Sequence, residues 1–278
     1  MNSTQYSYWM GDTPELESLL IGNLCLPGSH DAGSDKEAPN FQLPQEITQD
    51  ISPHAQIMHG IRALDLRVAF YDGYEPGDPA RFQLFHKTSS GRNIGKDIIS
   101  ALQEFYQSPR AQREIIVLDF HEFRDFTLAA HQELQSLIAK RLDDRLIPMN
   151  LSNSTLGDIW TKHPGKNIVV AYNHGERITQ FWYGVDQYWM GENTPSTAEL
   201  KEYMDSITDK YKSPHDLTAI QCAKYVWPFF VPDDFTDKID SWFESIDQDS
   251  YIQSFYIINT HRPPPSQLLP PSHHPNTL

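Results

Sequence analysis

The chain has little cysteine, few basic residues and no long apolar run. Its two cysteines, Cys25 and Cys222, lie in apolar stretches that we assign to different strands, so buried thiols are expected in place of a disulfide. That usage is typical of a reducing compartment. No Cys-x-x-Cys pair and no cluster of His and Cys in the sequence indicates a zinc site. A run of roughly 18 apolar residues is also missing, so no transmembrane helix is expected.

The shortage of positive charge narrows the range of partners. Lys and Arg total 22 against 37 Asp and Glu, for a net charge of −15. This excess argues against nucleic acid and against general adhesion to anionic membranes, although a local cationic pocket for one phosphate is compatible with it. The stretch Met1–Thr13 lacks the charged start and apolar core of a signal peptide. We therefore expect a cytoplasmic protein, with secretion by a leaderless route as the alternative.

Strand signals alternate with helix signals and predict an α/β fold, a TIM-like (β/α)8 barrel formed by residues 1–262. The rhythm is imperfect, because residues 71–81 carry no helix signal. Six prolines in residues 263–278 predict an extended or disordered tail. The expected strands are Ile21–Leu26, Ile61–Ala69, Phe82–Phe85, Glu114–Phe120, Asn167–Tyr172, Trp182–Tyr188, Leu217–Cys222 and Phe255–Ile258, and the expected helices are Ile94–Gln107, Leu128–Leu142, Ser196–Tyr211 and Phe235–Ile246.

Four charged or titratable side chains follow or end the first three strands. They are His30, Asp65, Arg67 and His86, and the active groups of such a barrel lie at the carboxyl ends of its strands. Asp65 and Arg67 alternate with leucines, so they share one face of their strand, where a buried charge must be paired or face a ligand. A guanidinium can bind a phosphate by two donors, and two imidazoles can act as general base and general acid. The pattern predicts acid–base chemistry on a phosphate.

Other candidate residues lie further along the same predicted rim. His121 follows the fourth strand and is expected either to contact substrate or to be a polar loop residue. Asp186 and Tyr188 suit a polyol ring, by hydrogen bonding and stacking, or else belong to an aromatic core strand with a capping aspartate. The apolar loop Trp227–Pro232 either enters a lipid interface or packs under the barrel rim, and we favour packing.

Taken together, the first three strands resemble the X domain of phosphatidylinositol-specific phospholipases C. The resemblance lies in Pro27–Asp31, in Gly60–Arg67 and in the strand ending at His86, with Ile115–Phe120 similar to the family's fourth strand. It covers most of residues 20–262, and the chain is most similar to the small X-domain-only branch that includes bacterial enzymes. The resemblance implies a TIM-like barrel that is irregular or incompletely closed.

The activity implied by the resemblance is cleavage of the phosphodiester of phosphatidylinositol. The inositol 2-hydroxyl attacks the phosphorus, which releases diacylglycerol and a cyclic inositol phosphate. By motif position, His30 is the general base, His86 the general acid and Arg67 the group that stabilises charge on the phosphoryl oxygens. Asp31 and Asp65 orient and tune these three side chains.

The resemblance also bears on metals and shows two departures from the family pattern. The calcium-dependent branch has no arginine at the Arg67 position, so a metal-independent site without a cofactor is expected. Lys87 stands where the family commonly has glycine, and it either brings a second cation to the phosphate or points outward. His261 lies near the position where the last strand usually ends in an aspartate that supports the base. Asp186 and Tyr188 match the spacing of the inositol-binding pair of bacterial members.

Two other functions stay open at this point. A non-catalytic module that binds an inositol headgroup or another protein would account for the missing aspartate. A glycerophosphodiester phosphodiesterase ranks lower, because its metal site follows an early His-Arg pair that the sequence lacks. The expected partners are phosphatidylinositol or another inositol phosphodiester and, transiently, a membrane surface, and the chain is expected to be a monomer that binds no nucleic acid.

Overall fold

A computed structural model describes residues 6–191, 196–207, 217–222 and 255–261. Three sequence-based expectations lie outside these ranges: the loop Trp227–Pro232, the helix Phe235–Ile246 and the tail 263–278. Within the described part of the chain, every helix is too short or too polar to cross a membrane.

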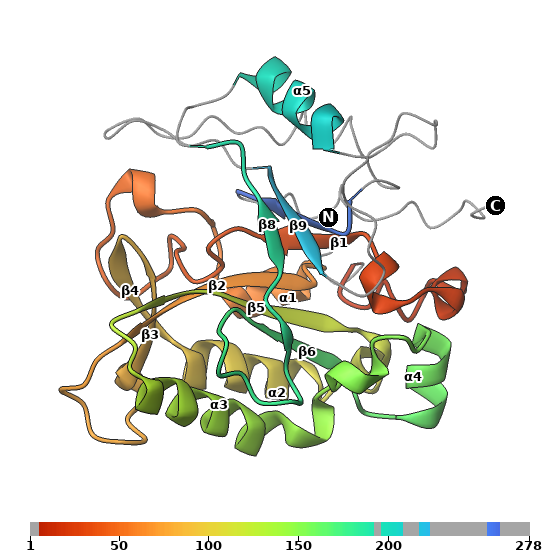
Figure 1. Cartoon of the computed structure of the whole chain (residues 1–278), viewed down its shortest axis with the longest axis horizontal. Helices are drawn as coiled ribbons and strands as arrows, with labels where there is room; N and C mark the ends of the chain where they lie inside the picture. Colours follow the sequence, from red (N-terminus) through yellow and green to blue (C-terminus); the bar gives the residue numbers. More distant parts are fainter. Residues whose placement is uncertain (1–5, 192–195, 208–216, 223–254, 262–278) are drawn as a thin grey trace.

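The sheet is a curled, mostly parallel barrel of the predicted α/β class (Figure 1). Its order is β7-β6-β5-β2-β1-β10-β9-β8, and every pairing along this path is parallel. The two end strands, β7 and β8, follow one another in the chain, so one irregular segment contacts both β6 and β9. The strands are β1 (Leu26–Ser29), β2 (Ala63–Phe70), β5 (Ile116–Arg124), β6 (Ile168–Tyr172), β7 (Trp182–Tyr183), β8 (Asp186–Tyr188), β9 (Thr218–Cys222) and β10 (Ile257–Thr260).

The predicted third barrel strand is instead antiparallel. β3 (Phe82–His86) runs back along β2, with Leu84 opposite Val68, and continues into β4 (Thr88–Asn93). The connection over residues 71–81 carries no crossover helix, and only antiparallel strands can be joined so directly. Because β2 extends past its neighbour β1 and β3 returns along it, His86 comes back to the level of Arg67.

The first strand also differs from its prediction. It begins at Leu26, where the expected strand ends, and Ile21–Asn23 forms a 3-10 turn. Pro27 and Gly28 therefore lie within β1, and no corner forms there. A Cβ atom on Gly28 would lie 2.1 Å from Oδ1 of Asn259, its neighbour on β10. Glycine fits here because the Asn259 side chain occupies the space that a Cβ atom would take.

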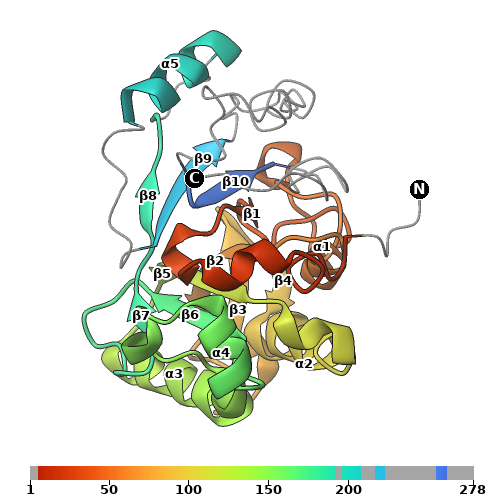
Figure 2. The same cartoon turned by 90° about the vertical axis from the view of Figure 1, so that its right-hand side faces the viewer.

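The helices cover the outer face of the barrel (Figures 1 and 2). α3 (Leu128–Leu142) has its predicted bounds, and its N-cap Thr127 accepts a hydrogen bond from the Ala130 backbone. The helix expected over Ile94–Gln107 is a π-helical segment (Ile94–Ser100) followed by α2 (Ala101–Phe105). The remaining described α-helices are α1 (Pro53–Met58), α4 (Leu156–Lys162) and α5 (Thr197–Ile207).

Alternation along the strands divides the core into an outer layer and a barrel interior. Leu64 and Leu118 pack outward with α2 and α3, whereas Ala63 and Val117 belong to the interior cluster. A third cluster lies under α5 and includes Cys222. Both cysteines are free thiols, as expected, but only Cys222 is buried, whereas Cys25 is half-buried.

A buried ion pair joins the N-terminal segment to the barrel. Nη2 of Arg62 lies 2.6 Å from Oε2 of Glu114, and both side chains are inaccessible to solvent. The backbone N–H of Gly11 donates to the same carboxylate at 2.8 Å, and the Arg62 guanidinium donates to the Ser7 carbonyl. Arg62 thus has a structural role in the motif that it shares with Asp65 and Arg67.

Candidate active site

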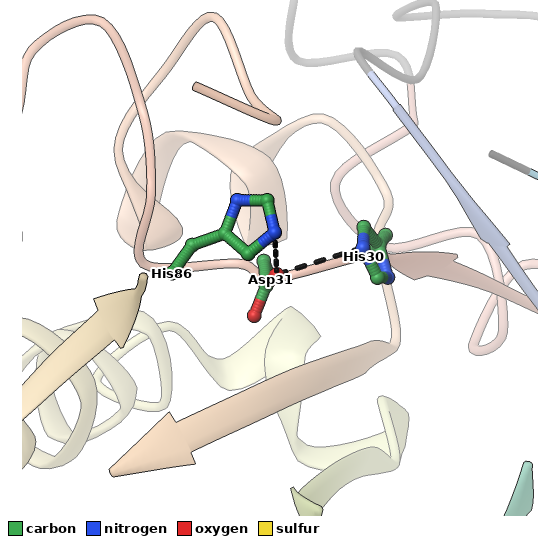
Figure 3. Close-up of side chains that lie close together, drawn as sticks. All are labelled: His30, Asp31 and His86. Atoms are coloured by element: carbon green, nitrogen blue, oxygen red, sulfur yellow. Dashed lines mark ion pairs between the residues drawn. The ribbon is translucent and has the colours of Figure 1, made fainter. Parts of the chain in front are cut away.

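The centre of the candidate site is a carboxylate between two imidazoles (Figure 3). Oδ2 of Asp31 lies 3.5 Å from Nε2 of His30 and 3.4 Å from Nε2 of His86. His30 and Asp31 follow β1, and His86 ends β3. His30 and Asp31 are almost completely buried. Asp65 contacts His30 and Arg67 contacts Asp31, so the structure brings together all five catalytic residues expected from the sequence.

The hydrogen bonds of the Nδ1 atoms of His30 and His86 determine which nitrogen of each ring faces the centre of the site. Nδ1 of His86 lies 3.0 Å from the carbonyl oxygen of Glu46, which can only accept a hydrogen bond. Nδ1 of His30 lies 2.8 Å from Oε1 of Gln221 and 3.2 Å from Oδ2 of Asp65. With Nδ1 donating in both rings, each neutral imidazole presents the lone pair of Nε2 to the centre of the site.

Arg67 supplies the positive charge of the site. Its Nε lies 2.8 Å from Oδ1 of Asp31, and its Nη1 lies 3.3 Å from Oε2 of Glu122. The side chain is 19% exposed, more than any other in the cluster of His30, Asp31, Asp65 and His86. A guanidinium held at the opening of a buried acid–base cluster can stabilise charge on phosphoryl oxygens.

Burial and neighbouring charges shift the pKa values of the acidic groups in opposite directions. Burial raises the pKa of Asp31 to about 6, against the opposing effects of Arg67 and His30. Burial also acts to raise the pKa of Asp65, but the hydrogen bond from His30 and the charge of Arg67 hold it below its ordinary value. Burial lowers the pKa of His86, so this ring favours the neutral form at pH 7.

Hydrogen bonds hold the loop after β1 in a strained conformation. Asp31 has a φ of 44°, in the left-handed region that few residues other than glycine adopt. The Thr48 hydroxyl donates to the Asp31 carbonyl at 2.9 Å, and the Gln49 amide donates to the His30 carbonyl at 2.7 Å. Strain of this kind persists only where the surroundings fix it, and it is common at functional sites.

A chain of polar side chains extends from His30 across the barrel interior. Gln221 on β9 donates to Oε1 of Gln187 on β8, and Gln187 donates to the carboxyl group of Asp119 on β5. Burial and the charge of Asp65 hold the pKa of Asp119 well above its ordinary range. These three residues were not expected from the sequence. Gln221 could have been found, because it shares the interior face of its strand with Leu217 and Ala219.

The expected substrate-binding residues are placed differently from the catalytic ones. Asp186 is exposed, and Tyr188 packs against the cluster under α5, because both alternate with the inward-facing Gln187. Lys87 is exposed and has a φ of 60°. His121 lies on β5, and its buried Nδ1 has no hydrogen-bond partner among the described residues.

His261 lies beside the base, as its place in the sequence indicates. Its ring centroid is 5.1 Å from that of His30, with the two ring planes tilted by 34°. The described acceptors of the His30 Nδ1 proton are nevertheless Gln221 and Asp65. Gln221 on β9 and Asp65 on β2 thus take the place of the carboxylate that the resemblance puts at the end of the last strand.

The donor set does not fit calcium. Among the described residues, the group of His, Cys, Asp and Glu side chains close enough to hold one ion is His30, Asp31 and His86. Calcium takes six to eight oxygen ligands, whereas this group offers two nitrogens and one carboxylate that is already paired with Arg67.

Comparisons with known proteins give relatives in sequence but no matching family model. The chain is 27% identical over 256 residues to the variant-surface-glycoprotein phospholipase C of Trypanosoma cruzi. The aligned region covers 78% of this chain and 64% of that protein. It is 25% identical over 227 residues to human PI-PLC X domain-containing protein 1, and this alignment covers 72% of this chain and 67% of that protein. The chain spans between 58% and 72% of the length of the curated relatives that it matches, and 64% of the trypanosomal protein.

Solved structures match over nearly the whole chain. The phosphatidylinositol-specific phospholipase C of Listeria monocytogenes has a TM-score of 0.69 and 17% identity, and the match covers 94% of this chain and 96% of that one. A mutant of the Staphylococcus aureus enzyme gives a TM-score of 0.68 at 15% identity, covering 93% and 92% of the two chains. The structural matches show that the fold is shared, and the sequence matches show which proteins are similar to the chain in sequence. The chain is similar in sequence to PI-PLC X domain-containing proteins and has the distorted TIM barrel of the bacterial phosphatidylinositol-specific phospholipases C.

Proposed function

We propose that this protein is a phospholipase C that cleaves the phosphodiester of phosphatidylinositol without a metal ion. The observation that carries the proposal is the arrangement of His30 and His86 on either side of Asp31, with Arg67 paired to the same carboxylate. A general base, a general acid and a fixed cation are the groups that an internal attack on a phosphodiester requires.

In the proposed reaction, the Nε2 atoms of His30 and His86 transfer the two protons. Nε2 of His30 takes the proton of the inositol 2-hydroxyl, and that oxygen forms a bond to phosphorus. The bond from phosphorus to the diacylglycerol oxygen breaks, and Nε2 of His86 gives this oxygen a proton. The products are diacylglycerol and a cyclic inositol phosphate, so every atom and proton is accounted for.

The protonated form of His86 needs support in the substrate complex, because burial favours the neutral ring. The negative phosphodiester supplies it, since an opposite charge nearby favours the charged form of a titratable group. Asp31 acts in the same direction, because its Oδ2 is 3.4 Å from Nε2 of His86. Arg67 then stabilises the charge that develops on the phosphoryl oxygens.

The loop between β1 and α1 supports access to a lipid substrate. Phe41 is 86% exposed and Leu43 is 41% exposed, and both precede Glu46, whose carbonyl holds His86. Large apolar side chains beside a catalytic opening are suited to a transient contact with a membrane surface. A solved structure of the Staphylococcus aureus relative concerns its membrane binding.

A binding module without catalysis is the second candidate, because the last strand carries no supporting carboxylate. The test separates the two functions. The protein is incubated with phosphatidylinositol vesicles, with phosphatidylcholine as the control, and release of a water-soluble phosphate is measured. We expect release from phosphatidylinositol alone, unchanged by excess EDTA and abolished in folded His30→Ala and His86→Ala variants. Headgroup binding without release would favour the binding module.

A further inference from the structure

We propose that His30, Asp31 and His86 form a binding site for a zinc ion, and that zinc bound there inhibits the enzyme. The site itself rests on the geometry of these residues, whereas the inhibition rests on the proposed function. No zinc motif is visible in the sequence, because the ligands come from two distant segments and include no cysteine.

The distances match the spacing of zinc ligands. Oδ2 of Asp31 is 3.5 Å from Nε2 of His30 and 3.4 Å from Nε2 of His86, too long for strong hydrogen bonds. A tetrahedral zinc ion with bonds of about 2.0–2.1 Å holds its ligand atoms about 3.4 Å apart. One ligand atom from each residue lies within 4.8 Å of the other two. The carboxylate oxygen is already at the required distance from both rings, and an ion could bind once the two ring nitrogens, up to 4.8 Å apart, move closer together.

Both rings already carry their lone pairs toward the ion position. Their Nδ1 atoms donate outward, to the Glu46 carbonyl at 3.0 Å and to the Gln221 amide oxygen at 2.8 Å. Zinc-bound histidines commonly donate their other N–H to such acceptors, which fixes the tautomer and the ring orientation. The outer acceptors required by a zinc site are thus present before any ion binds.

The donor types select the metal. Two imidazoles and one carboxylate suit zinc and other late first-row ions, whereas calcium and magnesium prefer oxygen ligands. Arg67 pairs with Oδ1 of Asp31 and leaves Oδ2 directed between the rings. Its positive charge weakens cation binding, so we expect micromolar rather than nanomolar affinity. The fourth position of the ion stays open to water or to a phosphate oxygen.

Zinc at this position stops the proposed reaction for a simple reason. It occupies the Nε2 lone pairs of both His30 and His86, which are the atoms that take and give the proton. An enzyme with zinc bound has neither a general base nor a general acid. Since substrate and ion need the same atoms, they compete.

Metal binding is tested on the full chain after treatment with EDTA and dialysis. Zinc is titrated by calorimetry, and Co²⁺ is used for its visible absorption in four-coordinate sites. We expect one site of micromolar affinity, weakened at least tenfold in His86→Gln and, independently, in Asp31→Asn. His163→Gln, outside the cluster, and a double variant His273→Gln/His274→Gln in the tail are matched controls that keep wild-type affinity. Loss of binding in the tail variant, or wild-type affinity in both folded cluster variants, would overturn the site.

Activity on phosphatidylinositol tests the second half of the proposal. We expect zinc to inhibit, EDTA to restore the rate, higher substrate concentrations to relieve inhibition, and calcium at the same concentration to have no effect. Stimulation by zinc would overturn the inhibition. Zinc binding at the cluster of a protein that cleaves no phosphatidylinositol would leave the site standing and refute the proposed function. Cleavage of phosphatidylinositol by a protein that binds no zinc would support the proposed function and refute the zinc site.

Discussion

His30 directs its Nδ1 at the amide oxygen of Gln221, 2.8 Å away. The general base of the proposed reaction is thus oriented from β9 by a neutral group and from β2 by Asp65, at 3.2 Å. Gln221 is held in turn by Gln187, which donates to the buried Asp119. The tautomer of His30 therefore depends on a network that spans the barrel interior.

Replacing Gln221 with methionine tests this network. Methionine has a similar size and shape but offers no comparable acceptor for the His30 N–H, so the ring is oriented by Asp65 alone. A hydrogen bond of this kind is worth roughly 1 kcal/mol, and we expect turnover of phosphatidylinositol to fall about fivefold. Gln221→Glu keeps an acceptor and should retain more activity than the methionine variant. Initial rates, with thermal unfolding as the control for folding, check this. Equal rates in wild type and Gln221→Met would remove the network from the account.

Neutralising Asp31 should stabilise the protein while ending its activity. The pKa of Asp31 is raised from 3.8 to about 6, so the folded state binds this proton more tightly than the unfolded state. The stability that this group contributes is fully present at pH values below its pKa in the unfolded chain, and it is lost as the pH rises through about 6. The full difference is on the order of 3 kcal/mol.

Asp31→Asn has no charge to bury, so its thermal midpoint should exceed that of wild type by roughly 5 °C at neutral or higher pH. The advantage should shrink at about pH 4, where both proteins carry a neutral side chain. Melting curves at the two pH values measure it. A variant less stable than wild type at the higher pH would contradict the linkage.

Lysine should not substitute for Arg67. The guanidinium contacts Asp31 through Nε and Glu122 through Nη1, and an ammonium on a flexible stem cannot reproduce this fork. We expect Arg67→Lys to lose about 10²-fold or more in kcat, as with removal of one donor from a site that stabilises an oxyanion. The steady-state rate on phosphatidylinositol is the measurement, and kcat within a few-fold of wild type would exclude the geometric role.

Gly28→Ala should destabilise the barrel by about 1–3 kcal/mol, because its Cβ would lie 2.1 Å from Oδ1 of Asn259 and that side chain would have to shift. The matched control is Gly73→Ala, where a Cβ meets nothing within 4 Å. Since the obstructing atom belongs to a side chain, Asn259→Ala in the same protein should recover part of the loss. Chemical denaturation compares the variants. An unchanged midpoint in Gly28→Ala would refute the close contact of the Asn259 side chain with Gly28.

The sequence was informative where local periodicity decides the structure. Leu128–Leu142 has a helical apolar face and a capping threonine, and its predicted bounds are those observed. The direction of β3 could not be predicted in the same way. Its five residues read as a strand in either direction, and only the pairing with Val68 shows that it runs backward.

Some residues of the site could also be predicted from the sequence, whereas others depend on the register of a strand. The charges of His30, Asp65 and Arg67 at strand ends were sufficient to locate the cluster, because unpaired charges are rarely buried. On β8 the alternation of side chains turns Gln187 inward and Asp186 outward. A shift of one residue in register reverses that choice, so a strand of three residues is too short to fix it from sequence.

In the proposed reaction, phosphatidylinositol is cleaved through attack by the substrate's own 2-hydroxyl. Phosphorus NMR of the reaction in excess EDTA tests this most directly, because a cyclic inositol phosphate has a resonance distinct from those of the diester and of an acyclic monoester. We predict that the cyclic signal appears first as the diester signal declines, and that it is absent with the His30→Ala variant. A diester signal that stays constant with wild-type protein, or an acyclic monoester formed with no cyclic precursor, would contradict the account.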